Sequence, residues 1–364
     1  MLRTALIGFP SAGKTTLFQL MTAHPDVPRG GHARLEASVG VARVPDSRLD
    51  RLAALFPRKK RIPATVEFAD LPGTGRTSTQ ALLDVAPFRD ADALVHVVRG
   101  FREPSIPHPS GAIRPEADAR AMEDELILAD LGVAERRLER LERDLKKMRS
   151  AELVSERDVL VRCRAALESG QPLRALDFHP EDRKRLRGFQ LLSAKPLLLV
   201  MNLDEADLGL AADSVRAAQS LGLGEFLRHA STRAVAVCAK IELEISQLEP
   251  ADAAAFLADL GLGELGTDRV IRATYDLLGH ITFLTVGENE CRAWSIPRGT
   301  NAHVAAGEIH SDIARGFIRA EVVHLVDLVA RGSITACREH GEVRLEGKDY
   351  VVQDGDVITF RFAT

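Results

Sequence analysis

The sequence has few cysteines, no long apolar run and no excess of positive charge. Its four cysteines lie far apart, and no two of them form a Cys-x-x-Cys pair. This pattern fits neither a disulfide framework nor a zinc site, so we expect reduced thiols. No stretch approaches the roughly 20 apolar residues of a membrane helix, and the apolar run at the N-terminus is too short for a signal peptide. We therefore expect a cytoplasmic protein without a membrane segment.

The charge balance excludes a protein that binds nucleic acid over its whole surface. The formal net charge is -4, although local basic patches are still compatible with that total. Hydrophobic residues make up 45% of the chain and charged residues 27%, which is the balance of an ordinary globular protein. A chain of 364 residues should hold roughly two to three domains.

Short apolar runs separated by helical patterns predict a parallel sheet. The expected strands are residues 3–7, 65–69, 93–98, 196–201 and 235–238. The first strand leads through a glycine-rich turn into a helix from Lys14 to Met21, and a helical pattern also follows the last strand. Nearly continuous apolar runs are typical of strands that are buried on both faces. These features predict a doubly wound α/β domain.

A long segment between the third and fourth strands has a helical pattern of its own. Apolar residues recur there at alternating spacings of three and four, namely Leu131, Ala134, Leu138, Leu141, Leu145 and Met148. Charged residues fill the positions between them, so we expect a coiled-coil-like helical hairpin that returns through residues 154–167. Its charged face is either solvated or a contact surface for a large partner.

From about residue 282 the pattern becomes that of a small β-rich domain. We expect strands at 291–296 and 317–323 and a helix at 302–312. Two further strands, 350–352 and 357–362, flank an Asp-Gly-Asp sequence that is typical of a β-hairpin turn.

The strongest functional signal is the sequence Gly8-x-x-x-x-Gly13-Lys14-Thr15 between the first strand and the first helix. Glycines let the backbone N–H groups turn inward around phosphates, and the helix N-terminus adds a favourable dipole. We expect Lys14 to reach the β- and γ-phosphates and the Thr15 hydroxyl to bind Mg²⁺. A chance glycine-rich turn is the alternative, but the strand–loop–helix context favours a site for a nucleoside triphosphate.

A second phosphate-site signal follows the strand at 65–69. The sequence Asp70-Leu71-Pro72-Gly73 places a carboxylate where a Walker-B aspartate approaches Mg²⁺. Gly73 can donate its backbone N–H to a γ-phosphate oxygen. Without the first motif, Asp-x-x-Gly would equally indicate a turn.

The order of these features resembles that of the YchF (Obg-like ATPase) family, and the resemblance runs nearly end to end. The phosphate loop, Asp-x-x-Gly, the helical insertion, Asn202-Leu203-Asp204-Glu205 and the C-terminal β domain follow one another in the family's order. Further matching stretches are Pro-Asp-Ser-Arg-Leu-Asp at 45–50, Ala-Leu-Val-His-Val-Val-Arg at 93–99, Leu-Arg-Ala-Leu-Asp at 173–177, Gly-Phe-Ile-Arg-Ala-Glu at 316–321 and Glu-Gly-Lys-Asp-Tyr at 346–350.

The resemblance implies a divergent member of a TRAFAC-class family of P-loop NTPases. It implies a G domain at 1–114 and 189–279 and an inserted α-helical coiled-coil domain at 115–188. Residues 280–364 would form a TGS domain of ubiquitin-like β-grasp form.

The resemblance also implies ATP in preference to GTP. Typical GTPases of this superfamily have Asn-Lys-x-Asp, whose aspartate accepts protons from guanine, whereas here the lysine is absent and Glu205 stands at the last position. A longer carboxylate cannot lie in the same plane without shifting the base, and adenine offers a different edge. Cys238-Ala239-Lys240 matches the loop that closes over the base. Capping of the following helix is the alternative role for Asn202 and Glu205.

A catalytic histidine is implied as well. Ras-like enzymes orient the attacking water with a Gln after the Asp-x-x-Gly glycine, but here that position is Thr74. The family's proposed substitute is a histidine in the loop after the third strand, and His108 within residues 105–111 matches it. A neutral imidazole can accept a proton from water or orient it, so we expect His108→Ala to lower turnover with little change in affinity. A solvated loop side chain is the alternative.

These inferences define the expected site. The expected nucleotide-binding residues are Gly8, Pro10, Ser11, Ala12, Gly13, Lys14, Thr15, Thr16, Asn202, Leu203, Glu205, Cys238 and Ala239. The expected metal ligands are Thr15 and Asp70, and the expected catalytic residues are Lys14, His108 and Gly73.

Three departures from the family's pattern bear on turnover. Ser11 stands where members usually have Asn, Arg34 replaces the usual Mg²⁺-ligating Thr of the first switch, and the stretch after Gly73 is shortened. Ser38 could replace that Thr, or Arg34 could contact phosphate. We expect slow hydrolysis of ATP, with GTP as a second candidate substrate. The rival hypotheses are a GTP-preferring GTPase and a nucleotide-gated RNA- or ribosome-interaction protein with negligible turnover.

The partners are also implied by the resemblance, since TGS domains are associated with RNA or ribosome contact. Candidate phosphate contacts in this domain are Arg292, Arg298, Arg315, Arg319 and Lys348. Acidic residues dilute their field and no aromatic stacking platform is evident, so we do not expect sequence-specific reading of RNA. Arg58-Lys59-Lys60-Arg61, assigned to the G domain, is either a nucleic-acid contact or a solvated loop. We expect a monomer that regulates translation or stress through the ribosome or ribosomal RNA.

Overall fold

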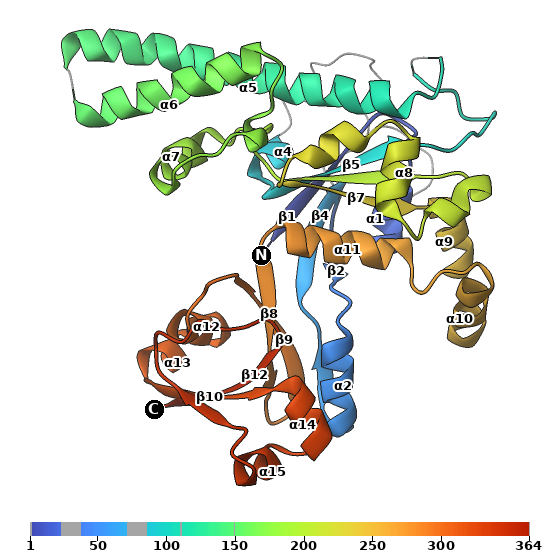
Figure 1. Ribbon diagram of the computed structural model, residues 1–364, viewed down its shortest axis with the longest axis vertical. Coiled ribbons are helices and arrows are strands. Elements are labelled where there is room, and N and C mark those ends of the chain that lie inside the picture. The colour runs from blue at the N-terminus through green and yellow to red at the C-terminus, as the bar shows by residue number, and fades with distance from the viewer. Residues whose placement is uncertain (1, 23–37, 71–85, 110, 149, 364) are drawn as a thin grey trace. The chain divides into compact units, whose positions relative to one another are not determined.

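The computed structural model describes residues 2–22, 38–70, 86–109, 111–148 and 150–363 (Figure 1). The chain divides into two compact units. The first comprises Met1–Ala42 and Glu67–Leu277, and the second comprises Arg43–Val66 and Leu278–Thr364. Among the described residues, no helix combines the length and apolar character needed to cross a membrane.

The first unit is built on a six-stranded sheet with the order β2-β4-β1-β5-β6-β7. Its strands are β1 (Arg3–Ile7), β2 (Ser38–Arg43), β4 (Thr65–Asp70), β5 (Ala93–Arg99), β6 (Leu197–Asn202) and β7 (Thr232–Val237). The pairs from β4 through β1, β5 and β6 to β7 are all parallel. Every residue of β5 and β6 is buried, which explains their continuous apolar sequences. The predicted parallel sheet is confirmed, and β2 is an additional strand.

Helices cover both faces of this sheet. The helices of the first unit are α1 (Lys14–Thr22), α4 (Ala86–Asp90), α5 (Pro115–Lys147), α6 (Ala151–Glu168), α7 (Pro180–Leu186), α8 (Ser214–Ser220), α9 (Ala239–Ile245), α10 (Pro250–Asp259) and α11 (Gly266–Leu277). Short 3₁₀ turns are η1 (Leu173–Ala175), η2 (Arg187–Phe189), η3 (Glu205–Leu210) and η4 (Gly224–Arg228). Figure 1 shows α11 on the opposite face of the sheet from α5. The arrangement is therefore doubly wound, as predicted.

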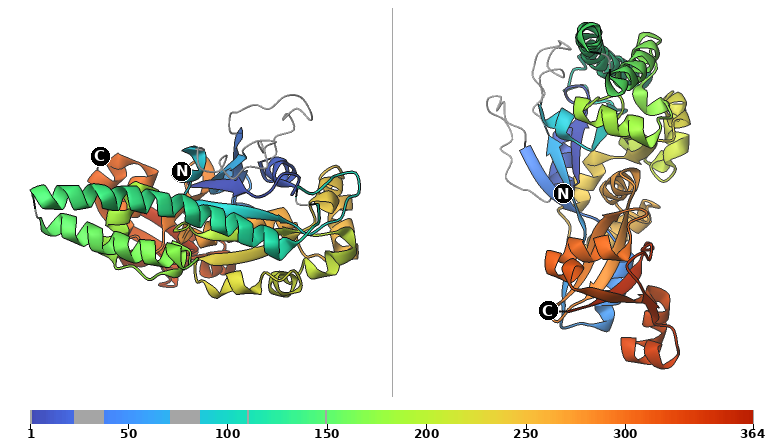
Figure 2. Two further views of the ribbon diagram at one scale, coloured as in Figure 1. Left: turned by 90° about the horizontal axis from the view of Figure 1, so that it is seen from above. Right: turned by 90° about the vertical axis from the view of Figure 1, so that its left-hand side faces the viewer.

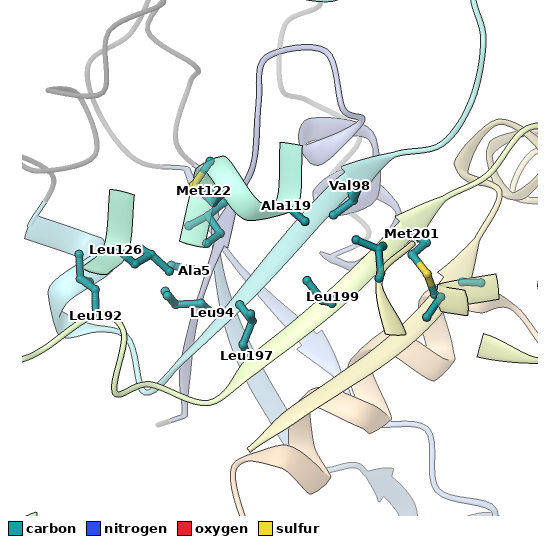
Figure 3. Packing of buried hydrophobic residues seen from close by; sticks show 14 of the residues in the cluster. Ala5, Leu94, Val98, Ala119, Met122, Leu126, Leu192, Leu197, Leu199 and Met201 are labelled. Carbon is teal, nitrogen blue, oxygen red and sulfur yellow. The ribbon is translucent and has the colours of Figure 1, made fainter. Parts of the chain in front are cut away.

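One core layer joins the sheet to the beginning of α5. Leu94 and Val98 of β5 pack in one cluster with Ala119 and Met122 of α5 (Figure 3). Leu199 of β6 belongs to the same cluster. This packing fixes the start of α5 against the strand whose end borders the functional site.

Beyond the sheet, α5 continues into the predicted helical hairpin. Helix α5 is 33 residues long and packs against α6 (Figure 2). The seam contains Ala134, Leu138 and Leu141 from α5, packed in one cluster with residues of α6 such as Leu160. The seam is shorter than expected, because Met148 lies past the end of α5 and is exposed.

The second unit contains a six-stranded sheet with the order β11-β10-β12-β8-β9-β3. Its strands are β3 (Lys60–Ile62), β8 (His280–Val286), β9 (Glu290–Pro297), β10 (Phe317–His324), β11 (Arg344–Glu346) and β12 (Asp356–Phe362). Its helices are α2 (Ser47–Leu55), α12 (Ala302–Ile309), α13 (Ser311–Arg315), α14 (Leu325–Arg331) and α15 (Ile334–Glu339). The helix expected at 302–312 is two helices, because the backbone at His310 is extended.

The predicted hairpin around residues 354–356 is wrong. Residues 350–352 form only one isolated bridge, between Val351 and Asn301, whereas β12 pairs with β10 and β8. The aspartates of the expected turn bind groups outside the turn instead. Asp354 accepts a hydrogen bond of 2.9 Å from the N–H of Thr282, and buried Asp356 accepts one of 2.8 Å from the Tyr350 hydroxyl.

The segment 43–66 lies in the second unit, which differs from its predicted place in the G domain. Strand β3 pairs in parallel with β9, and α2 contacts α14 and β9. Arg48 bridges Asp46 and Asp354 at 2.9 Å each. Lys59 donates a hydrogen bond of 2.8 Å to the carbonyl of Glu288. Apart from Asp46, these partners are about 230 to 310 positions away in sequence, so local patterns do not indicate the pairing.

Candidate functional site

The loop between β1 and α1 has the backbone conformation that its glycines permit. Gly8 has φ of 140° and Gly13 has φ of 97°, values that L side chains rarely adopt. A Cβ at Gly8 would clash with the carbonyl of Val97, and one at Gly13 would clash with the Asn202 amide. Ser11 also has a positive φ, of 63°. The motif is therefore a structured phosphate loop and not a chance turn.

Lys14 lies inside this loop. Its Nζ donates hydrogen bonds of 2.9 Å to the carbonyls of Gly8 and Phe9. Burial lowers the pKa of Lys14 below its ordinary value, and the charge of Asp70 opposes that shift. No ion pair joins Lys14 to a carboxylate of the described residues. A phosphate group would give this buried cation the charged acceptor that the carbonyls do not provide.

Thr15 and Asp70 form a compact oxygen pair beside Lys14. The Thr15 hydroxyl donates a hydrogen bond of 2.7 Å to Oδ2 of Asp70. The other carboxylate oxygen, Oδ1, is buried and has no hydrogen-bond partner within the part of the chain that the structure describes. Burial raises the pKa of Asp70, opposed by the bond from Thr15 and the charge of Lys14. An orphaned carboxylate oxygen beside a hydroxyl fits a magnesium ion, whose remaining ligands would be phosphate and water.

The described residues contain no cluster of three or more His, Cys, Asp or Glu side chains that could hold a metal.

A cavity of about 550 Å³ adjoins the loop. It is lined by Pro10, Ser11, Gly13, Lys14, Thr15, Thr16, Phe101, Arg102, Glu103, Ile106, Asn202, Leu203, Asp204, Glu205, Cys238, Ala239, Lys240 and Leu243. Its position at the carboxyl edge of the parallel strands is where ligands bind in open α/β sheets. Most of the expected nucleotide-binding residues are therefore brought together, while Gly8 and Ala12 belong to the loop beneath them.

Asn202 connects the two ends of the cavity. Its amide donates a hydrogen bond of 3.1 Å to the carbonyl of Ala12 and accepts one of 3.0 Å from the N–H of Ala239. The side chain is buried, so it fastens the phosphate loop to the start of α9. The alternative that Asn202 caps the following helix is not what the structure contains.

Glu205 lies at the other end of the cavity and forms an ion pair with Lys240. The capping role considered for Glu205 belongs to Asp204, whose carboxylate accepts a hydrogen bond of 3.3 Å from the N–H of Ala206 at the start of η3. Asp204 also accepts one of 2.9 Å from the N–H of Arg102. Leu203 is buried and occupies the position where typical GTPases of the superfamily have lysine.

Sequence reasoning missed the wall contributed by Phe101, Arg102, Glu103 and Ile106. These residues directly follow β5, and the carboxyl ends of neighbouring parallel strands meet at one edge of a sheet. This rule could have placed these residues beside the phosphate loop from the sequence. Gly73, Thr74 and Arg34 lie outside the described residues, and Ser38 is the first residue of β2.

His108 is buried and not solvated. Its Nε2 lies 2.9 Å from Oδ2 of Asp118, and the two side chains are only 3% and 9% exposed. Its ring centroid lies 6.3 Å from that of Phe9 in the phosphate loop. His108 is not among the residues that line the cavity. The solvated alternative is therefore wrong, and the catalytic role stays a prediction.

Comparisons with known proteins extend over the whole chain. The family model YchF-GTPase_C, described as a protein of unknown function, matches residues 280–363. The chain is 40% identical over 366 residues to "Ribosome-binding ATPase YchF" of Bacillus subtilis (strain 168), covering 99% of each. It is 36% identical over 370 residues to the protein of the same name from Escherichia coli O157:H7, again covering 99% of each. The solved structure of the Schizosaccharomyces pombe YchF GTPase matches with a TM-score of 0.84 at 26% identity, covering 99% of this chain and 97% of that one.

Proposed function

The chain belongs to the YchF family, and from this premise and the site geometry we propose that it is a slow, ribosome-binding ATPase that uses Mg²⁺. The observation that carries the ATPase proposal is the phosphate loop, in which Lys14 and the Thr15–Asp70 pair converge beside a cavity of about 550 Å³. The bacterial relatives are named ribosome-binding ATPases, which supports both halves of the proposal.

Hydrolysis would proceed by attack of water on the γ-phosphorus, in line with the bond to the β–γ bridging oxygen. The new P–O bond forms as that bridging bond breaks, and ADP and phosphate leave. Lys14 and the amides of the loop would stabilise the charge on the transferring group. Thr15 and Asp70 would hold Mg²⁺, which neutralises phosphate charge when bound. Gly73 would donate its N–H to the γ-phosphate, as we predict from the sequence.

We propose adenine as the preferred base, with Leu203 and Glu205 as the residues that distinguish it. Titration of the purified protein with ATP and GTP is expected to give a dissociation constant at least about tenfold lower for ATP, or roughly 1.4 kcal/mol of discrimination. Matching titrations with ADP and GDP separate the contribution of the base to the affinity from that of the γ-phosphate. A tenfold or greater preference for GTP would reverse the assignment. The related protein from Schizosaccharomyces pombe is named a GTPase.

A nucleotide-gated interaction protein with negligible turnover is the second candidate function. The observation in its favour is the altered sequence of the switch segments, where Arg34 stands at the position of the usual Mg²⁺-ligating Thr. Phosphate release measured with and without ribosomes, and with K⁺ or Na⁺, separates the two functions. An undetectable rate in every condition would favour the interaction protein.

The segment 43–66 is our candidate for the ribosome contact. Its seven basic and two acidic residues give it a net charge of +5, in a chain whose total is -4. Arg43, Arg51, Arg58 and Lys60 are exposed, and none of them forms an ion pair with a residue that the structure describes. Exposed cations without carboxylate partners suit the phosphates of ribosomal RNA. A ribosome partner also implies a cytoplasmic location, where we expect the protein to act as a monomer.

Reversing two of these charges, in the variant Arg58→Glu/Lys60→Glu, is expected to weaken co-sedimentation with ribosomes. The salt dependence of binding should also become shallower, by a log–log slope of about 1 per lost phosphate contact. ATP hydrolysis without ribosomes should stay at the wild-type rate. The matched reversal Lys146→Glu/Lys147→Glu, near the end of α5, tests the hairpin. Loss of ribosome binding in the hairpin variant alone would indicate that the ribosome contact lies on the hairpin and not on the segment 43–66.

A further inference from the structure

One wall of the cavity is a segment without regular secondary structure. Residues 100–109 connect the end of β5 toward the start of α5 and form neither helix nor strand. Four of them, Phe101, Arg102, Glu103 and Ile106, line the cavity. Because backbone ladders do not hold this segment, its shape depends on side-chain contacts.

Arg99 holds the first half of this wall. Its guanidinium donates hydrogen bonds to the carbonyls of Phe101, Glu103 and Ile106, at 3.3, 3.4 and 3.0 Å. It also lies over the Phe101 ring, 4.6 Å from the centroid. Arg99 is only 2% exposed, and hydrogen bonds from a buried cation are costly to break.

His108 anchors the second half. Its side chain is buried between Asp118, on the first turn of α5, and the Phe9 ring of the phosphate loop. Asp118 lies one position from Ala119, which packs against the sheet. The carboxylate is therefore held in place by the core of the first unit, whereas His108 belongs to an irregular segment.

We infer that Asp118 is a positioning residue. Through His108 it anchors the end of the 101–109 wall, so that the start of α5 sets the shape of the nucleotide site. This inference rests on the proposed ATP site and adds a function for a residue that touches neither nucleotide nor metal. Burial raises the pKa of Asp118, while the charges of His108 and Arg99 oppose the shift.

The test is equilibrium binding of mant-ATP to the full chain. Asp118→Ala and His108→Ala should each raise the dissociation constant about tenfold, because each change removes the buried imidazole–carboxylate contact. For His108→Ala this replaces the sequence-based expectation of a nearly unchanged affinity. The double variant should bind no more weakly than either single variant, because both changes remove the same contact. Asp118→Asn keeps an acceptor for the imidazole and should lose less affinity. Asp124→Ala is the matched control, since Asp124 is an exposed aspartate on the same helix.

The possible outcomes separate this inference from the proposed function. Thermal denaturation shows whether Asp118→Ala and Asp118→Asn are folded. If both are folded and bind mant-ATP as tightly as the wild type does, the positioning role is rejected. Additive losses in the double variant reject it as well. A lower turnover at unchanged affinity in His108→Ala would mean that His108 acts only in catalysis, without anchoring the wall. Absence of binding to the wild-type protein would reject the ATP site itself, and this role of Asp118 with it.

Discussion

Replacing Lys14 by alanine is expected to weaken ATP binding by about a hundredfold while the protein remains folded. The ammonium is buried in the phosphate loop. Within the described part of the chain, its hydrogen bonds go only to the carbonyls of Gly8 and Phe9. Bound phosphates would replace these neutral acceptors by charged ones, which form stronger hydrogen bonds. The loss should be larger for ATP than for ADP, because Lys14 is expected to reach the γ-phosphate.

Isothermal titration calorimetry with ATP and ADP measures this effect. Lys14→Met is the control for volume, because it removes the charge and keeps an unbranched side chain. Burial lowers the pKa of Lys14, which means that the folded protein bears a cost for the charged form. The melting temperature without nucleotide should therefore not fall in Lys14→Met. Equal affinities of variant and wild type for ATP would show that the triphosphate does not lie on this loop.

Asp70→Asn is expected to have opposite effects on activity and on stability. Hydrolysis at saturating ATP and Mg²⁺ should fall by about a hundredfold or more, because the ion supplies several kcal/mol of charge stabilisation and would lose its carboxylate ligand. The protein without nucleotide should be at least as stable as the wild type. Thr15 can still donate its hydrogen bond to the asparagine oxygen, and the variant buries no charge at this position.

The sign of the stability effect follows from the pKa of Asp70, which burial raises. The folded state then holds its proton more tightly than the unfolded state. This contribution to stability is present at acidic pH and is lost as the pH rises through the folded-state pKa. Above the folded-state pKa the wild type has lost it and buries a charged carboxylate, whereas the neutral asparagine carries no such cost at any pH.

Calorimetric unfolding with and without Mg²⁺ and ATP, beside a phosphate-release assay, tests both effects in one protein. Asp124→Asn, on an exposed position of α5, should change neither. A variant that hydrolyses ATP at the wild-type rate would remove Asp70 from the metal site. Ligand-binding groups commonly lower the stability of the unliganded protein, so their removal should not destabilise it. A strongly destabilised variant would therefore indicate that Asp70 has a structural role.

The first sheet and the helical hairpin were predictable because the sequence patterns that indicate them are local. β5 and β6 are buried throughout, and only strands covered on both faces have such continuous apolar sequences. The seam of α5 repeats at heptad spacing for the same reason, since one stripe of the helix is buried against α6. By contrast, β3 has only three residues, which alone indicate no strand; its pairing depends on β9, which lies far along the chain.

The phosphate loop was readable from the sequence in detail. Left-handed backbone at Gly8 and Gly13 requires glycine, and a lysine must follow at a defined spacing to reach the phosphates. The residues that form this loop are contiguous in the sequence, so their order and spacing can be read directly. The amino-acid order alone was therefore sufficient for the family, the fold class and the backbone conformation of this loop.

The partners of individual side chains came only from the folded chain. Asn202 was expected among the nucleotide-binding residues, and only the folded chain shows that its amide bridges Ala12 and Ala239. His108 was expected to be either catalytic or solvated, and only the folded chain shows that it is not solvated but buried against Asp118, ten positions away on a helix. The segment 43–66 joined the second unit, where β3 pairs with β9. Each of these contacts joins groups whose distance is set by the packing of separate elements, and no local pattern of residue types encodes that distance.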